Sequence, residues 1–175
     1  MKYAAFLRGI NVGGKNKIKM DALRETIAEL GFENVKTYIN SGNVVFESAE
    51  TGHKELSDKL EKAIQTDFDL NIKVMVRSLP EIEEIVENNP FAGQFENEKE
   101  LHVFFLNEGL AAEKREMLVS NNNENEMYAV GNREIYCLLR AGVIDSLMGK
   151  DYIGKKLKVS ATARNWRTIN KILKL

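Results

Sequence analysis

A chain of 175 residues with 43% hydrophobic residues can bury an ordinary core, and its net charge of −1 argues against the strongly basic class of nucleic-acid-binding proteins. No apolar run approaches the roughly 20 residues that cross a bilayer, and the first residues enter a strand pattern without a cleavable signal segment, so we expect a cytoplasmic protein with no membrane association. A single cysteine and two histidines exclude an internal disulfide and leave no metal-ligand spacing, so neither a metal nor another cofactor is expected.

The first half of the chain begins with an apolar strand, a glycine-rich loop and a helix. Residues 2–10 are almost continuously apolar, which is typical of a strand that is buried on both faces. After the loop, apolar residues recur at helical spacing, and Gly31 stands where a left-handed C-terminal cap is needed. The apolar positions of this helix are Met20, Leu23, Ile27 and Leu30.

Two short strands, a second helix and a further strand complete this half. Residues 35–39 and 43–47 read as strands, and Ser41-Gly42 supplies the flexible residues of a hairpin turn between them. The next helix has an apolar face, and residues 73–77 follow it as a strand. That face consists of Leu56, Leu60, Ala63, Ile64 and Phe68. The order βαββαβ is that of the ferredoxin-like unit.

The pattern then restarts after a connector. Ser78 and Glu81 form a capping-box pair, so a short helix should run to Asn89, where Pro90 ends it. The second half should contain strands at 101–106, 127–130 and 134–139 and helices at 110–119 and about 162–173. Residues 142–160 are compatible with a short helix, a strand or an ordered loop.

We therefore predict an α+β protein of two ferredoxin-like halves that arose by duplication, with helices packed on antiparallel or mixed sheets. The expected division is an N-terminal half at 1–79, a connector helix and loop at 80–100, and a C-terminal half at 101–175. No convincing residue identity links the halves, so the duplication rests on the order of elements.

Three polar clusters rich in glycine or asparagine lie beside these elements: RGINVGG at 8–14, INSGN at 39–43 and TARNWRT at 162–168. Core building does not explain such composition, so each cluster is a turn, a helix cap or part of a polar site. Two of the three lie in basic segments. Residues 1–24 carry six basic residues and one acidic residue, and residues 150–175 carry eight and one, whereas residues 80–100 carry seven glutamates and one lysine.

The first cluster is close to a phosphate-binding P-loop, because Gly9 is followed at the right spacing by Gly14 and Lys15. However, Asn16 stands where a Ser or Thr would bind magnesium, and the helix begins too late to direct its N-terminus at phosphates. The glycine spacing also fails the dinucleotide-binding pattern. Nucleotide triphosphate hydrolysis is therefore not expected.

Two interpretations of this loop remain open. Its backbone N–H groups, with Arg8 and Asn11, would suit an anion-binding nest. Alternatively, Gly13 and Gly14 only provide the positive φ that a strand-to-helix connection requires. Arg8 favours a site, since a charge at the end of an apolar strand must find a partner or solvent.

The other two clusters have strong structural explanations. A hairpin turn accounts for Ser41, and Asn40 and Asn43 satisfy the turn backbone or contribute to a site. In the last cluster, Thr162 or Asn165 can cap the final helix, and Trp166 fills the core.

The arginines of the last cluster are harder to explain. Arg164 and Arg167 are expected in or near a first helical turn, where the helix dipole disfavours a cation by about 0.3–1 kcal/mol. A carboxylate of the chain or an anionic ligand should offset this.

Single reactive residues carry little signal. Cys137 alternates with Ile135 and Leu139 in a strand and is expected to fill the core. His102 has no Ser, Cys or carboxylate at a catalytic spacing. With no recognisable pair of nucleophile and base, the sequence leaves open whether the protein is an enzyme.

The motifs LRGINVGGKNKI, TYINSGNVVF and TARNWRT, in this order, resemble the bacterial family called domain of unknown function 1697. The resemblance spans nearly the whole chain. It implies a duplicated α+β architecture of ferredoxin-like halves and implies no activity. Family members tend to carry a Ser-Lys or similar motif before the last helix, and in the comparable residues 144–148 only Ser146 fits.

These observations lead to the hypothesis of a basic polar pocket that binds a small anionic or phosphate-bearing ligand. It requires the beginning and the far end of the chain to meet. The expected ligand-binding residues are Arg8, Asn11, Gly13, Gly14, Asn40, Ser41, Asn43, Arg164 and Asn165.

Two other functions are compatible with the sequence. A nucleic-acid-binding module would stack bases on sheet aromatics such as Tyr3, Phe6 or Tyr38, although the acidic runs would repel the phosphate backbone. A protein-interaction or assembly domain would show an exposed apolar patch. The sequence does not specify an oligomeric state.

Overall fold

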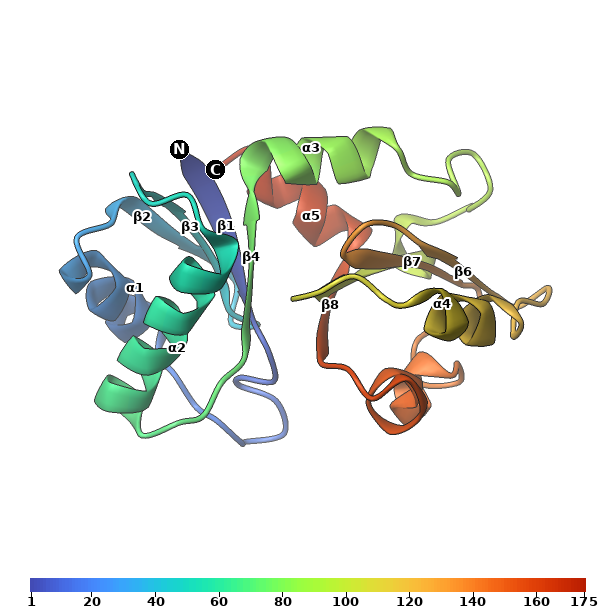
Figure 1. The fold of residues 1–175 in the computed structure, drawn as a ribbon, viewed down its shortest axis with the longest axis horizontal. Helices are drawn as coiled ribbons and strands as arrows, with labels where there is room; N and C mark the ends of the chain where they lie inside the picture. Colours follow the sequence, from blue (N-terminus) through green and yellow to red (C-terminus); the bar gives the residue numbers. More distant parts are fainter. The chain divides into compact units, whose positions relative to one another are not determined.

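The computed structural model describes residues 1–175, which divide into two compact units. Unit 1 comprises Met1–Glu84 and Lys171–Leu175, and unit 2 comprises Ile85–Asn170. Each unit contains its own four-stranded antiparallel sheet (Figure 1). None of the helices combines the length and apolar character needed to cross a membrane. That residues 80–100 form a connector separate from both halves stays a prediction.

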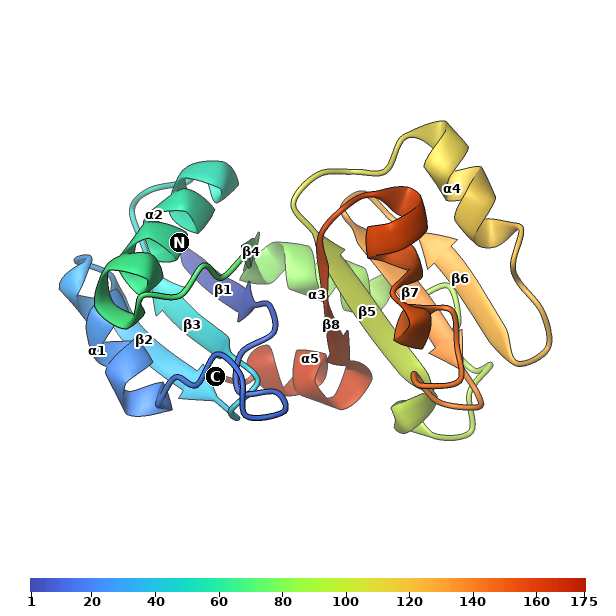
Figure 2. The same cartoon turned by 90° about the horizontal axis from the view of Figure 1, so that it is seen from below.

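Unit 1 has the expected order of elements. Its sheet has the strand order β2-β3-β1-β4, which is that of a ferredoxin-like fold, and α1 and α2 lie on one face of it (Figure 2). The elements are β1 (Lys2–Leu7), α1 (Met20–Glu29), β2 (Glu33–Tyr38), β3 (Asn43–Glu47), α2 (His53–Phe68) and β4 (Val74–Ser78), followed by α3 (Leu79–Glu87).

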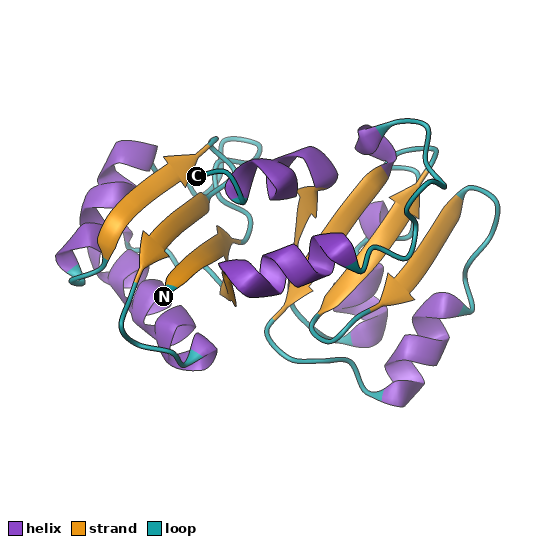
Figure 3. Cartoon of the chain, turned by 90° about the horizontal axis from the view of Figure 1, so that it is seen from above, coloured by secondary structure: helices purple, strands orange, loops and turns teal.

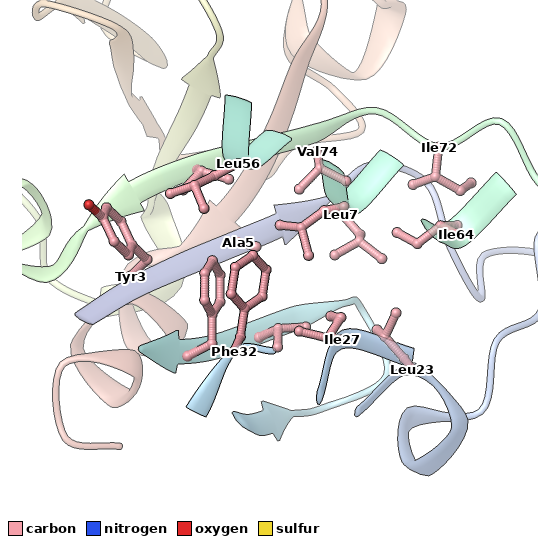
Figure 4. Packing of buried hydrophobic residues seen from close by; sticks show 14 of the residues in the cluster. Tyr3, Ala5, Leu7, Leu23, Ile27, Phe32, Leu56, Ile64, Ile72 and Val74 are labelled. Atoms are coloured by element: carbon pink, nitrogen blue, oxygen red, sulfur yellow. The ribbon is translucent and has the colours of Figure 1, made fainter. Parts of the chain in front are cut away.

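The core of unit 1 lies between the sheet and these two helices. Tyr3, Ala5 and Leu7 point from β1 toward the apolar faces of α1 and α2 (Figure 4). The alternate residues Ala4 and Phe6 are 1% and 0% exposed, so β1 is buried on both faces, which explains its continuous apolar run.

This burial corrects one expectation. Tyr3 and Phe6 are 1% and 0% exposed, so neither can stack on a nucleic-acid base. A ferredoxin-like sheet binds RNA through a solvent-exposed face, and these two aromatic residues are covered. Tyr38 is half-buried.

Unit 2 repeats the topology with the strand order β6-β7-β5-β8 (Figure 2). Figure 3 shows the strands of both sheets in orange. Residues 142–160 form two short helical turns, η2 and η3, at the place in the chain that α2 occupies in unit 1; they pack on a core that contains Cys137. The elements are η1 (Glu98–Glu100), β5 (Leu101–Leu106), α4 (Ala112–Val119), β6 (Glu126–Val130), β7 (Glu134–Leu139), η2 (Met148–Lys150), η3 (Ile153–Leu157), β8 (Ala161–Asn165) and α5 (Trp166–Ile172). The prediction of two ferredoxin-like halves is confirmed.

The expected start of the last helix is wrong. Residues 161–165 form strand β8, in which Thr162 and Arg164 are buried and pair with Phe105 and Val103 of β5. The helix begins at Trp166. Asn165 is its cap, since Asn165 Oδ1 accepts a hydrogen bond from the Thr168 N–H at 2.8 Å.

The register of the two sheets reveals a repeated residue that comparison of the halves missed. Arg77 pairs with Ala4, the third residue of β1, and Arg164 pairs with Val103, the third residue of β5. In each case the guanidinium Nη1 donates to the carbonyl of the preceding residue at 2.8 Å. Both arginines are buried. The structural similarity of the two halves therefore extends to this side chain.

The predicted capping box of α3 is present and includes a third residue. Glu81 Oε2 accepts hydrogen bonds from the Ser78 N–H at 2.7 Å and the Ser78 hydroxyl at 2.9 Å, and it lies 2.6 Å from His53 Nε2 of α2. Burial opposes ionisation of Glu81, but the hydrogen bonds from Ser78 and His53 outweigh it and lower the pKa of Glu81 to about 2.

We expect Glu81→Gln to lower the free energy of unfolding by about 1–3 kcal/mol at pH 7. The folded pKa lies below its usual value, so this contribution is complete above about pH 4.5 and is lost as the pH falls toward about 2. Urea denaturation at several pH values measures the difference. Glu84→Gln, an exposed position of the same helix, is the control. A wild-type advantage that stays constant down to pH 2 would contradict the assignment.

Candidate functional site

The loop between β1 and α1 is fastened by Asn11. Its Nδ2 donates to the Ile18 carbonyl at 2.9 Å and to the Asn40 carbonyl at 2.8 Å, and its Oδ1 accepts from the Ile18 N–H at 2.9 Å. Asn11 has φ +54, a region that asparagine tolerates better than most residues. The first two polar clusters of the sequence therefore meet in unit 1, and Asn11 is the residue that joins them.

The second cluster builds the turn between β2 and β3. Asn43 is 1% exposed, and its Nδ2 donates to the Tyr38 carbonyl at 2.9 Å and to Ser41 Oγ at 3.0 Å. Gly42 has φ +86, and its carbonyl accepts from the Leu7 N–H at 2.9 Å. Asn43 and Ser41 thus have a structural role in the turn, whereas the side chain of Asn40 is exposed.

The two consecutive glycines form a tight turn. Gly13 and Gly14 have φ +57 and +75, and Val12 and Lys15 pair across them, with the Lys15 N–H donating to the Val12 carbonyl at 3.0 Å. Two successive residues with positive φ are typical of a type I′ turn. The structural interpretation of these glycines is therefore supported, while their role as an anion-binding nest stays a prediction.

A pocket of about 580 Å³ lies beside this loop. Sequence reasoning had not assigned Lys17 and Lys19 to it. Ile18 is 4% exposed and lies in the core, whereas Lys17 and Lys19 on either side of it are exposed, as alternation along an extended segment requires. This alternation of charged and apolar residues is the signal in the sequence that could have indicated them. The pocket is lined by Asn11, Gly14, Lys17, Ile18, Lys19 and Asn40.

The two arginines predicted to bind the ligand, Arg8 and Arg164, differ in their exposure to solvent. Arg8 is exposed at the end of β1. Arg164 lies in strand β8 of unit 2, where it is 6% exposed and its Nη1 donates to Thr162 Oγ1 at 2.8 Å, and burial lowers its pKa to about 10. It is not in a helical turn, so the argument from the helix dipole does not apply to it. That Arg8, Arg164 and Asn165 share one concavity stays a prediction.

Ser78 and Cys137 have structural roles. Ser78 Oγ donates to Glu81 and caps α3. Cys137 is fully buried, and burial raises the pKa of its thiol, so it is a core residue as predicted. Burial also lowers the pKa of His102. The residues that line the pocket of unit 1 thus include two exposed lysines, Lys17 and Lys19.

Comparison with known proteins places the chain in a family. None of the curated proteins matches it. The conserved bacterial protein SP0830 from Streptococcus pneumoniae has a solved structure that is similar, with 30% sequence identity, a TM-score of 0.79, and coverage of 99% of this chain and 97% of that one. The model of the family described as Protein of unknown function (DUF1697) matches residues 1–136. The chain therefore belongs to the DUF1697 family.

Proposed function

We propose that the pocket beside the β1–α1 loop binds a small anionic or phosphate-bearing ligand. The observation that carries the proposal is the presence of two exposed lysines, Lys17 and Lys19, among the residues that line one pocket of about 580 Å³. This volume is within the range of small-molecule sites. Hydrogen bonds from an ammonium group to a phosphate are charge-assisted and stronger than neutral ones.

The start of α1 supports the same ligand. Lys19 is the N-cap residue, and no side chain caps the helix, so the first N–H groups of α1 are left for solvent or a ligand. The acidic residue of this turn, Asp21, pairs with Arg24 at 2.8 Å, which partly balances its charge. The helix dipole then adds to the attraction of the lysines for an anion.

The asparagines give the pocket its shape. Asn11 uses its amide to hold the loop against the hairpin, and both Asn11 and Asn40 line the pocket. The exposed amide of Asn40 is the side-chain hydrogen-bond donor that we assign to the ligand. In this proposal Asn11 positions the site and does not itself bind the ligand.

Calorimetric titration with inorganic phosphate and with phenyl phosphate tests the proposal. The double variant Lys17→Gln/Lys19→Gln should bind at least about tenfold more weakly than the wild type, because two charge-assisted contacts are lost. Lys54→Gln/Lys62→Gln removes the same charge from the exposed surface of α2 and should change affinity by less than about twofold. Equal affinities of the two double variants, or no binding of either anion by the wild type, would refute it.

A further inference from the structure

We propose that residues 121–125, the asparagine strap, close the free edge of the sheet in unit 2 and prevent a second copy of the chain from adding a strand there. Strand β6 stands at one end of the order β6-β7-β5-β8, so it has a strand neighbour on one side only (Figure 2). An edge strand offers unpaired N–H and C=O groups to other strands. The strap and β6 share no residue with the proposed anion pocket of unit 1.

The hydrogen bonds between β6 and β7 show which backbone groups of β6 point away from the sheet. The Asn125 carbonyl accepts from the Arg140 N–H at 2.9 Å, and the Gly131 N–H donates to the Glu134 carbonyl at 2.8 Å. In an antiparallel ladder, residues that bond to the neighbouring strand alternate with residues whose N–H and C=O point the other way. The odd-numbered residues therefore face β7, and the even-numbered residues face outward. The outward residues are Glu126, Tyr128 and Val130.

The strap bonds to the outward groups of Tyr128 and Glu126. Asn122 Oδ1 accepts from the Tyr128 N–H at 2.8 Å and Asn122 Nδ2 donates to the Tyr128 carbonyl at 3.1 Å, so one side-chain amide pairs with both groups as a strand would. Asn123 Oδ1 accepts from the Glu126 N–H at 3.2 Å, and the Asn123 N–H donates to the Glu126 carbonyl at 2.9 Å. A strand that adds to this edge must first break these four hydrogen bonds.

Both ends of the strap are fixed to unit 2. Asn121 Nδ2 donates to the Met117 carbonyl at 2.8 Å, which holds the start of the strap at the end of α4. The bond from the Arg140 N–H to the Asn125 carbonyl holds its other end. Between them, Asn122 is exposed to solvent. Replacing Asn122 therefore opens the edge without removing a side chain from the core.

The corresponding edge of unit 1 is protected in another way. Strand β2 carries the charged residues Glu33 and Lys36, and its register with β3 shifts between them. Charges and an irregular register both discourage strand addition. Strand β6 has the sequence EMYAV, contains neither lysine nor proline, and pairs with β7 in continuous register. It lacks the protection that β2 has, and the strap supplies a substitute.

Sedimentation velocity over a range of protein concentrations tests the proposal by comparing the wild type with Asn122→Ala. The variant should keep the far-UV circular dichroism spectrum of the wild type. It should self-associate at least about tenfold more tightly, because the N–H and C=O of Tyr128 become available to β6 of a second copy. Asn97→Ala is the control and should behave as the wild type, since it removes an exposed acceptor of the Lys99 N–H elsewhere in unit 2.

The double variant Asn122→Ala/Val130→Pro tests whether the new association uses this edge. Proline removes the outward N–H of Val130 and disfavours a second strand beside β6, so self-association should return to the wild-type level. Self-association of Asn122→Ala that equals that of the wild type, or that persists in the double variant, would overturn the proposal. Failure of Asn122→Ala to fold would also overturn it, because the strap would then be required by the fold itself.

Hydrogen exchange of the wild type gives a check that needs no substitution. At low protein concentration the N–H of Tyr128 should exchange at least about tenfold more slowly than that of Val130, because Asn122 covers the first and no strap residue bonds to the second. Equal and rapid exchange of both groups would show that the strap does not close the edge.

Discussion

Replacing Gly42 with alanine is expected to lower the free energy of unfolding by about 3 kcal/mol, the largest effect of any single substitution proposed for this protein. A Cβ at this position would lie 2.7 Å from Ile10 Cδ1 and 2.8 Å from Leu7 Cβ, and φ is +86. Leu7 belongs to a packed core, so the backbone of the turn would have to move. Urea denaturation followed by far-UV circular dichroism measures the loss.

Gly31 provides a matched control. Its φ is +85, but no atom lies within 4 Å of a Cβ built there. Gly31→Ala therefore places alanine at the same unfavourable positive φ but without the close contacts that a Cβ at Gly42 would make. It should lower the free energy of unfolding by about 1 kcal/mol. The difference between the two variants isolates the close approach of the turn to β1. Equal losses would show that the packing of Leu7 and Ile10 against Gly42 has no energetic role.

Asn11→Ala should lower the free energy of unfolding by about 2–3 kcal/mol, because three hydrogen bonds are removed. Two of them, to the carbonyl and the N–H of Ile18, lie in a part-buried environment. It should also weaken anion binding, since the loop is no longer held against the hairpin at the Asn40 carbonyl. Equilibrium denaturation and calorimetric titration with phenyl phosphate provide the two measurements.

Asn16→Ala is the appropriate comparison for this variant. Asn16 has φ +49, close to the +54 of Asn11, but its side chain makes one exposed hydrogen bond, to the Gly9 carbonyl at 3.0 Å. Asn16→Ala should lower the free energy of unfolding by about 1 kcal/mol and leave the affinity for the anion within about twofold of that of the wild type. If both variants lose the same stability and the same affinity, Asn11 does not organise the pocket.

The fold could be predicted largely from periodicity and from glycine and proline. The apolar run of β1, the helical spacing before Gly31 and the capping box at Ser78 each indicate one element with a local physical cause. Strand β8 was missed because it has five residues and its buried alternate positions are Thr162 and Arg164, which carry no apolar signal. Residues 161–165 form a strand because they pair with β5, and the sequence around them does not reveal pairing with a segment so far away in the chain.

The candidate site was predictable only in part. The sequence offered a role in the turn backbone as one of two interpretations of Asn43, and the structure shows its amide on the Tyr38 carbonyl, but nothing in the sequence indicated that Asn11 uses its amide on the backbone. That distinction depends on which carbonyl groups the fold brings within reach. Lys17 and Lys19 were visible as charge, and only the burial of Ile18 shows that both face the same pocket.

The most direct test of the central claim is an NMR titration of the isotope-labelled protein with phenyl phosphate, in which backbone amide shifts locate the bound ligand. The largest shifts are expected at Asn11, Gly14, Asn40 and residues 17–22, which comprise the pocket lining and the start of α1. Shifts that cluster in unit 2, or that spread over exposed lysines without a maximum at the β1–α1 loop, would contradict the assignment of the site.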